Sequence, residues 1–153
     1  MAQALVVTVP EGNPMLDCKA GGINAHESPL KISLDWQSAG AGTVSLAIAS
    51  TYSAAMPDRR SHPQPSKIRG FLTRVDTIPD TGGTAPDMNY SITLLDVNSV
   101  DRALGNLLNR SNVTTESWQP SDPPWIDDEL TLTITAAGDT NGGTVVLYLE
   151  PQR

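Results

Sequence analysis

The sequence predicts an all-β fold, an antiparallel β-sandwich or jelly-roll-like single domain over residues 1–153 with one short helix and long loops. Threonine and serine are abundant while lysine and glutamate are scarce, the reverse of a helical bundle. The 12 glycines and 12 prolines supply residues for turns. Apolar and polar residues alternate in several short segments, with the period of a strand that has one buried face. A chain of 153 residues suits one core.

The alternating segments predict the strands of the sandwich, and they are residues 4–9, 31–36, 44–49, 67–78, 89–96, 130–135 and 145–149. A Gly-rich connection at 39–42 predicts that the second and third of these pair as a hairpin. Asn141-Gly142 predicts a second hairpin between the last two. Gly70 indicates a bulge or a close backbone approach within the long fourth segment.

The spacing of apolar residues predicts a helix over about 99–110, lying on the sheet or over its open end. Ser99 is a candidate N-cap, Asp101 is in the first turn and Arg110 is in the last turn. The apolar side chains would form one stripe, made of Val100, Ala103, Leu104, Leu107 and Leu108.

Two segments predict loops. Residues 54–66 contain three prolines and the adjacent Arg59 and Arg60, which indicates an exposed, basic, Pro-rich loop. Residues 111–128 have no apolar period and contain three further prolines with Trp118 and Trp125. A long structureless stretch often contacts a partner, so the two tryptophans either cover the core or anchor an interface.

The net charge of −7 argues against general nucleic-acid binding, which needs lysine and arginine to neutralise phosphates. No apolar run is long enough to span a bilayer, and no secretory signal pattern begins the sequence. Residues 113–153 carry a local charge of −6, whereas residues 59–74 carry +5. We expect those five cations to meet an acidic partner surface or a neighbouring subunit, the alternative being a solvated basic face: Arg59, Arg60, Lys67, Arg69 and Arg74.

The residues that carry enzyme chemistry are few and lack catalytic or metal-binding spacing. Cys18 is the single cysteine, and neither His26 nor His62 lies in a catalytic or metal-ligating motif. No phosphate-binding glycine motif occurs, so we expect no enzyme activity and no cofactor or metal. Four carboxylates could gather around Ca²⁺, although without the spacing of a known loop: Asp122, Asp127, Asp128 and Glu129.

Over a little more than half its length, the chain resembles small β-rich virion proteins of tailed bacteriophages. The resemblance rests on IRGFLTRVDTIPD, NYSITLLDVNSVDRALGNLLNR and LTLTITAAGDTNGGTVVLYLE. In that group a Tyr-x-x-x-Leu-x-Asp strand, matched here by Tyr90, Leu94 and Asp96, leads into a helical turn, matched loosely by Asp101 and Leu104. A closing Val-x-Leu-Tyr-like strand is matched by residues 145–150.

The resemblance implies a capsid decoration, or cement, protein. Such a protein would bind the major capsid protein and copies of itself, as a trimer, on the capsid exterior after synthesis in the host cytoplasm. The alternatives are a tail or head–tail connector protein and a β-sandwich that binds carbohydrate or a host surface. The last alternative requires Trp118 and Trp125 to be exposed.

Overall fold

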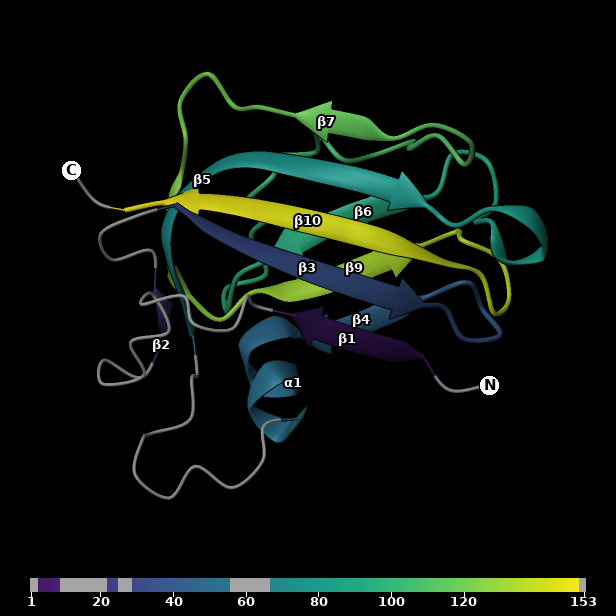
Figure 1. Ribbon diagram of the computed structural model, residues 1–153, viewed down its shortest axis with the longest axis horizontal. Coiled ribbons are helices and arrows are strands. Elements are labelled where there is room, and N and C mark those ends of the chain that lie inside the picture. Colours follow the sequence, from purple (N-terminus) through teal and green to yellow (C-terminus); the bar gives the residue numbers. More distant parts are fainter. Residues whose placement is uncertain (1–2, 9–21, 25–28, 56–66, 152–153) are drawn as a thin grey trace.

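The computed structural model describes residues 3–8, 22–24, 29–55 and 67–151. Two antiparallel sheets pack face to face in a β-rich single domain, with one short helix beside them (Figure 1). The all-β prediction is therefore confirmed.

The larger sheet has the strand order β1-β3-β10-β5-β2, and β7 and β8 also pair with β5. All these pairings are antiparallel except that between β2 and the start of β5. The strands are β1 (Ala4–Thr8), β2 (Gly22–Asn24), β3 (Leu30–Gln37), β5 (Lys67–Pro79), β7 (Glu116–Trp118), β8 (Trp125–Asp128) and β10 (Gly142–Glu150).

The smaller sheet has the order β4-β9-β6, with β4 (Val44–Ala47), β6 (Ser91–Leu95) and β9 (Thr131–Thr135). Leu132 and Ile92 of this sheet are fully buried in one core with Leu34 and Leu147 from the larger sheet. This alternation of buried and solvent-facing residues is the pattern from which the strands were predicted.

The two predicted hairpins are wrong, because β3 and β4 lie in different sheets, as do β9 and β10. Each connection is an arch that crosses from one sheet to the other, and the two arches hydrogen-bond to each other. Ser38 Oγ donates to the Gly138 carbonyl and accepts from the Asn141 N–H at 3.1 Å. The Ala137 N–H donates to the Gly42 carbonyl at 3.0 Å. The alternation predicted the strands correctly but did not determine their partners.

The helix predicted at 99–110 is also wrong, since that segment consists of turns. The helix that forms is α1 (Ile48–Ala55), where a strand was predicted to continue through Ala49. Its N-terminus is capped from a distance: the Glu129 carboxylate accepts from the backbone N–H groups of Ala49 at 2.8 Å and Ser50 at 3.0 Å. A cap from a residue so far along the chain leaves no local sequence signal.

The segment predicted as a loop at 111–128 contains β7 and β8, which both pair with β5. Of the basic loop predicted at 54–66, Ala54 and Ala55 end α1, and the remainder lies outside the described residues. The bulge in β5 lies at Thr73, where the register with β10 shifts between Tyr148 and Leu149, and not at Gly70.

Candidate functional site

The segment 96–110 runs along the edge of β6 that pairs with no other strand. β6 is the outer strand of the smaller sheet. The Arg102 N–H donates to the Leu94 carbonyl at 2.8 Å, and the Arg110 N–H donates to the Tyr90 carbonyl at 2.7 Å. The Leu107 carbonyl accepts from the Ile92 N–H at 3.0 Å. These backbone groups of the segment hydrogen-bond to the edge of β6 instead of to one another, as they would in a helix. The segment therefore covers this edge of the sheet and protects it from pairing with another chain.

Two aspartates hold the turns of this segment. Asp96 Oδ1 accepts from the backbone N–H groups of Asn98 at 2.9 Å and Val100 at 3.0 Å. Asp101 accepts from Ala103 at 3.0 Å and Gly105 at 2.8 Å, and also from Leu94 of β6 at 3.1 Å. A carboxylate that accepts several N–H groups competes with helical hydrogen bonding, which is why no helix forms.

The predicted apolar stripe is divided between the core and the surface. Ala103 and Leu107 are fully buried, whereas the other large apolar side chains of the segment face outward. The exposed fractions are 66% for Val97, 47% for Val100, 76% for Leu104, 46% for Leu108 and 78% for Val113. We call these five side chains the 97–113 surface.

No exposed residue between positions 97 and 115 carries a charge. The charged side chains of that stretch bond inward: Arg110 pairs with Glu116 at 2.9 Å, and Arg102 donates to the Trp125 carbonyl at 2.9 Å. Elsewhere the described surface exposes carboxylates at Asp35, Asp80, Asp87, Asp122, Asp127 and Asp139. The exposed residues of this stretch are therefore apolar or uncharged polar, whereas the exposed surface elsewhere carries these carboxylates.

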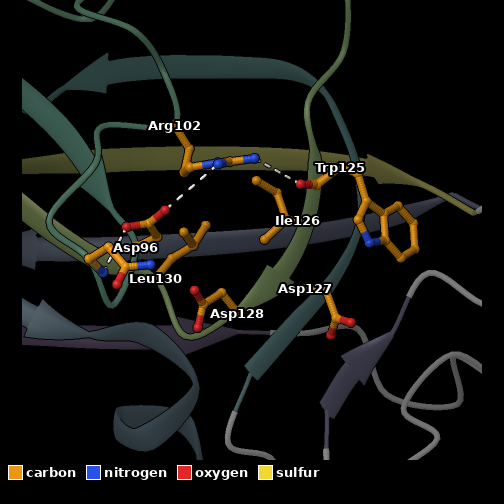
Figure 2. A pocket seen from close by; sticks show the side chains of 8 residues that line it. Asp96, Arg102, Trp125, Ile126, Asp127, Asp128 and Leu130 are labelled. Atoms are coloured by element: carbon orange, nitrogen blue, oxygen red, sulfur yellow. Dashed lines mark hydrogen bonds and ion pairs between the residues drawn. The ribbon is translucent and has the colours of Figure 1, made fainter.

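A pocket of about 310 Å³ opens between the start of this segment and β8. Figure 2 shows Ile126 and Asp128 on one side of β8, with the Trp125 indole and the Asp127 carboxylate on the other. Arg102 lies within 3.7 Å of the Asp96 carboxylate. The eight described residues that line the pocket carry carboxylates, an amide and a guanidinium but no hydroxyl, thiol or imidazole.

The basic residues predicted as a partner surface are paired where the structure describes them. Lys67 and Arg69 both contact Asp127 Oδ1, at 2.9 Å and 2.7 Å. Their hydrogen bonds lower the pKa of Asp127. Arg59 and Arg60 lie outside the described residues.

Arg74 takes part in a polar network on the outer face of the larger sheet. Arg74 Nε donates to Asp76 Oδ1 at 2.7 Å, and Ser117 Oγ donates to the same oxygen at 2.6 Å. Burial opposes ionisation of Asp76, but the bonds from Arg74 and Ser117 outweigh it and lower the pKa of Asp76. The guanidinium also lies 5.1 Å from the centre of the Tyr148 ring. Arg74 therefore has internal partners.

Both predicted tryptophans are half-buried. Trp118 packs against the core, and Trp125 meets Phe71 edge to face with 5.0 Å between ring centres. Neither presents a fully exposed ring, and the Trp125 indole lies across β8 from Asp128. Tyr90 is fully buried in the core, and burial raises its pKa to about 12.

Within the described ranges, no three histidine, cysteine, aspartate or glutamate side chains gather as a metal site. Of the four carboxylates considered for Ca²⁺, Asp127 pairs with Lys67 and Arg69, while Glu129 caps α1. None of the described helices is long and apolar enough to cross a membrane.

The prediction from sequence did not identify Asp96 and Asp101 as the residues that shape the candidate surface. A signal was present, because residues that favour turns and left-handed backbone follow each aspartate: Asn98, Gly105 and Asn109. The exposure of Leu104 had no such signal, since its spacing is also that of a helix face. Searches of protein families, curated proteins and solved structures found no match to this chain.

Proposed function

We propose that this chain is a bacteriophage capsid decoration protein, which binds the assembled shell through protein–protein contacts and stabilises it. The proposal follows from the resemblance of three segments to small virion proteins of tailed phages. Its mechanism is mass action, since a protein that binds only the assembled shell adds its binding free energy to that state.

The observation that carries the proposal is the 97–113 surface. Interfaces between proteins are depleted of charge at their centres, and exposed apolar patches mark interaction sites. Here five large apolar side chains are exposed in a stretch whose exposed residues carry no charge. A surface of this kind supports a function in binding another protein.

Lys67, Arg69 and Arg74 pair with aspartates. We therefore propose the 97–113 surface, and not these cations, as the contact with the shell. Cations that are already neutralised add little attraction toward an acidic capsid. Because these cations already have carboxylate partners, we expect the binding of the shell to depend on apolar area more than on ionic strength.

The alternatives differ in where the chain would bind. A tail or head–tail connector protein would bind tail or portal assemblies and leave the shell unoccupied. A carbohydrate-binding sandwich needs an exposed aromatic platform, whereas Trp118 and Trp125 are half-buried. We therefore retain the decoration protein as the proposal.

The test uses expanded and immature shells of the phage whose genome carries this sequence. The purified chain is mixed with each kind of shell, and both co-sedimentation and the melting temperature of the shell are measured. We expect the chain to sediment with expanded shells, to leave immature shells largely unoccupied, and to raise the melting temperature of the expanded shell. Absence of binding to either shell would rule out the proposal.

A further inference from the structure

We propose that the pocket beside β8 binds an organic cation, the ammonium or guanidinium group at the end of an alkyl chain. Two sources present this chemistry: a lysine or arginine side chain of a bound protein, and a free alkylamine. The pocket adjoins the 97–113 surface but contains none of its five side chains. Its volume of about 310 Å³ is at the small end of the range of ligand pockets, so it suits one such group.

The charge of the pocket favours a cation. Three aspartates and one arginine line it. Asp127 points to the other side of β8, where two cations neutralise it. The remaining carboxylates, those of Asp96 and Asp128, share the pocket with the single guanidinium of Arg102. One negative charge is left over in a protein whose net charge is also negative, and such a field attracts cations and repels anions.

Asp96 supplies a buried acceptor to the pocket. Its side chain is only 9% exposed, and its Oδ1 accepts two backbone N–H groups. Its Oδ2 lies 3.7 Å from Arg102 Nη1, which is beyond hydrogen-bond distance, and accepts no hydrogen bond from another described residue. A largely buried carboxylate oxygen without a donor is unfavourable. The N–H groups of a bound ammonium or guanidinium supply that donor.

Arg102 forms a wall of the pocket instead of a close ion pair with Asp96. Its Nη2 donates to the Trp125 carbonyl at 2.9 Å, and its backbone N–H donates to the Leu94 carbonyl at 2.8 Å. Figure 2 shows the guanidinium stretched between the Asp96 carboxylate and the Trp125 carbonyl. The bond to β8 therefore holds this guanidinium where it does not satisfy Asp96, and a second cation is needed to do so.

Asp128 completes the site beside an apolar wall. Its Oδ1 accepts the N–H of Glu129 at 2.9 Å, and no described cation lies within ion-pair distance of its carboxylate. Ile126 and Leu130, which have no polar side-chain atoms, line the pocket next to it. Charges beside an apolar wall attract each other more strongly than charges surrounded by water. The pocket thus combines an unpaired carboxylate with surroundings in which an ion pair is strengthened.

Amide chemical shifts of the isotope-labelled full chain test the inference. The probes share one alkyl stem and differ in charge: n-butylammonium, n-butylguanidinium, n-butanol and butyrate. We expect the two cations to shift the amide signals of Asn98, Asp128 and Leu130 in a saturable way, and the neutral and anionic probes to leave them unchanged. Absence of saturable shifts with both cations, or equal shifts with n-butanol, would overturn the inference.

Two variants of the pocket should act in opposite directions. Asp128→Asn keeps the size of the side chain and an acceptor for the Glu129 N–H but removes the charge, so we expect at least about tenfold weaker binding of both cations. Arg102→Gln removes the competing guanidinium and should tighten binding. Loss of structure would not produce this opposition, and the amide spectra report the folding of each variant. Asp122→Asn, at an exposed position outside the pocket, is the matched control and should bind like the unchanged chain. Unchanged affinity in Asp128→Asn would overturn the inference.

Expanded shells then distinguish the two sources of the cation. Added n-butylguanidinium should release the chain from shells if a side chain of the shell fills the pocket, and should leave it bound if the ligand is a free amine. n-Butanol at the same concentration is the control. Both results support a cation site once the amide shifts are observed. If the cations bind the pocket but the chain binds no shell, the proposed function fails and the inference stands.

Discussion

The carboxylate of Asp101 accepts a 2.8 Å hydrogen bond from the backbone N–H of Gly105. This contact lies inside a segment whose apolar spacing predicts a helix. Together with the bond from Ala103, it turns the chain so that Leu107 enters the core while Leu104 faces solvent. The uncharged apolar surface therefore depends on an acidic side chain that takes no part in it.

Replacement of Asp101 tests this dependence. Asp101→Ala leaves three backbone N–H groups without their acceptor, so the free energy of unfolding should fall by about 1–3 kcal/mol. Urea unfolding measures the change. Asp122→Ala, at an exposed position, is the control and should stay within about 0.5 kcal/mol of the unchanged chain. An equally small effect at Asp101 would mean that its carboxylate does not hold the turn.

The cap on α1 gives a second prediction. Glu129→Ala removes the acceptor for the N–H groups of Ala49 and Ser50, and caps of this kind contribute about 0.5–2 kcal/mol. We expect the midpoint of urea unfolding to fall by a corresponding amount. Faster amide hydrogen exchange across Ile48–Ala55 should accompany it, and exchange in the centre of β10 should change least. Unchanged exchange in α1 would contradict the role of Glu129.

Local patterns were sufficient to predict strands and insufficient to predict their partners. The alternation in β3, β9 and β10 predicts each strand because a half-buried strand has a period of two. Whether β9 pairs with β10 or crosses to the other sheet depends on contacts such as that between Ser38 and Asn141, which are distant in sequence. The helix at Ile48 likewise depends on Glu129, which no local pattern reveals.

The contact between the two arches can be tested at Ser38, which is fully buried. Ser38→Ala removes the donor to the Gly138 carbonyl and the acceptor for the Asn141 N–H, so it should destabilise the fold by about 1–3 kcal/mol. Thermal or urea unfolding measures the loss. Ser121→Ala, at an exposed position, serves as the comparison and should be near neutral. Equal stabilities of the two variants would show that the arches do not depend on this hydroxyl.

Acidic pH should destabilise the fold through Asp76 and Asp127. Both have a pKa lowered from the ordinary value of 3.8, so the folded state binds fewer protons than the unfolded chain. Their contribution is complete above that ordinary value and is lost as the pH falls through the lowered pKa of each group. The free energy of unfolding, measured by urea titration from neutral to acidic pH, should show this decline.

A variant isolates the contribution of the buried carboxylate. Asp76→Asn removes one titrating group, so the decline of stability at acidic pH should be shallower than in the unchanged chain. Asp122→Asn should retain the full decline. If Asp76→Asn declines just as steeply, the interaction with Arg74 does not favour the charged carboxylate.

The candidate surface could be predicted only in part. The sequence placed Val100, Leu104 and Leu108 on one apolar stripe, but a stripe on a helix would have been buried on the sheet. Their exposure follows from two carboxylates that bind backbone N–H groups and from the free edge of β6, both of which depend on tertiary contacts. The predicted basic surface also depends on tertiary contacts. Lys67 and Arg69 pair with Asp127, which is distant from both in the sequence, so the sequence did not reveal that they are neutralised.

Cryo-electron microscopy of expanded shells incubated with the chain tests the central claim most directly, because it shows both the binding and the surface used. The account predicts added density on the shell exterior, with residues 97–113 of each bound copy against the shell. Shells without added density, or bound copies whose Leu104 faces solvent, would contradict it.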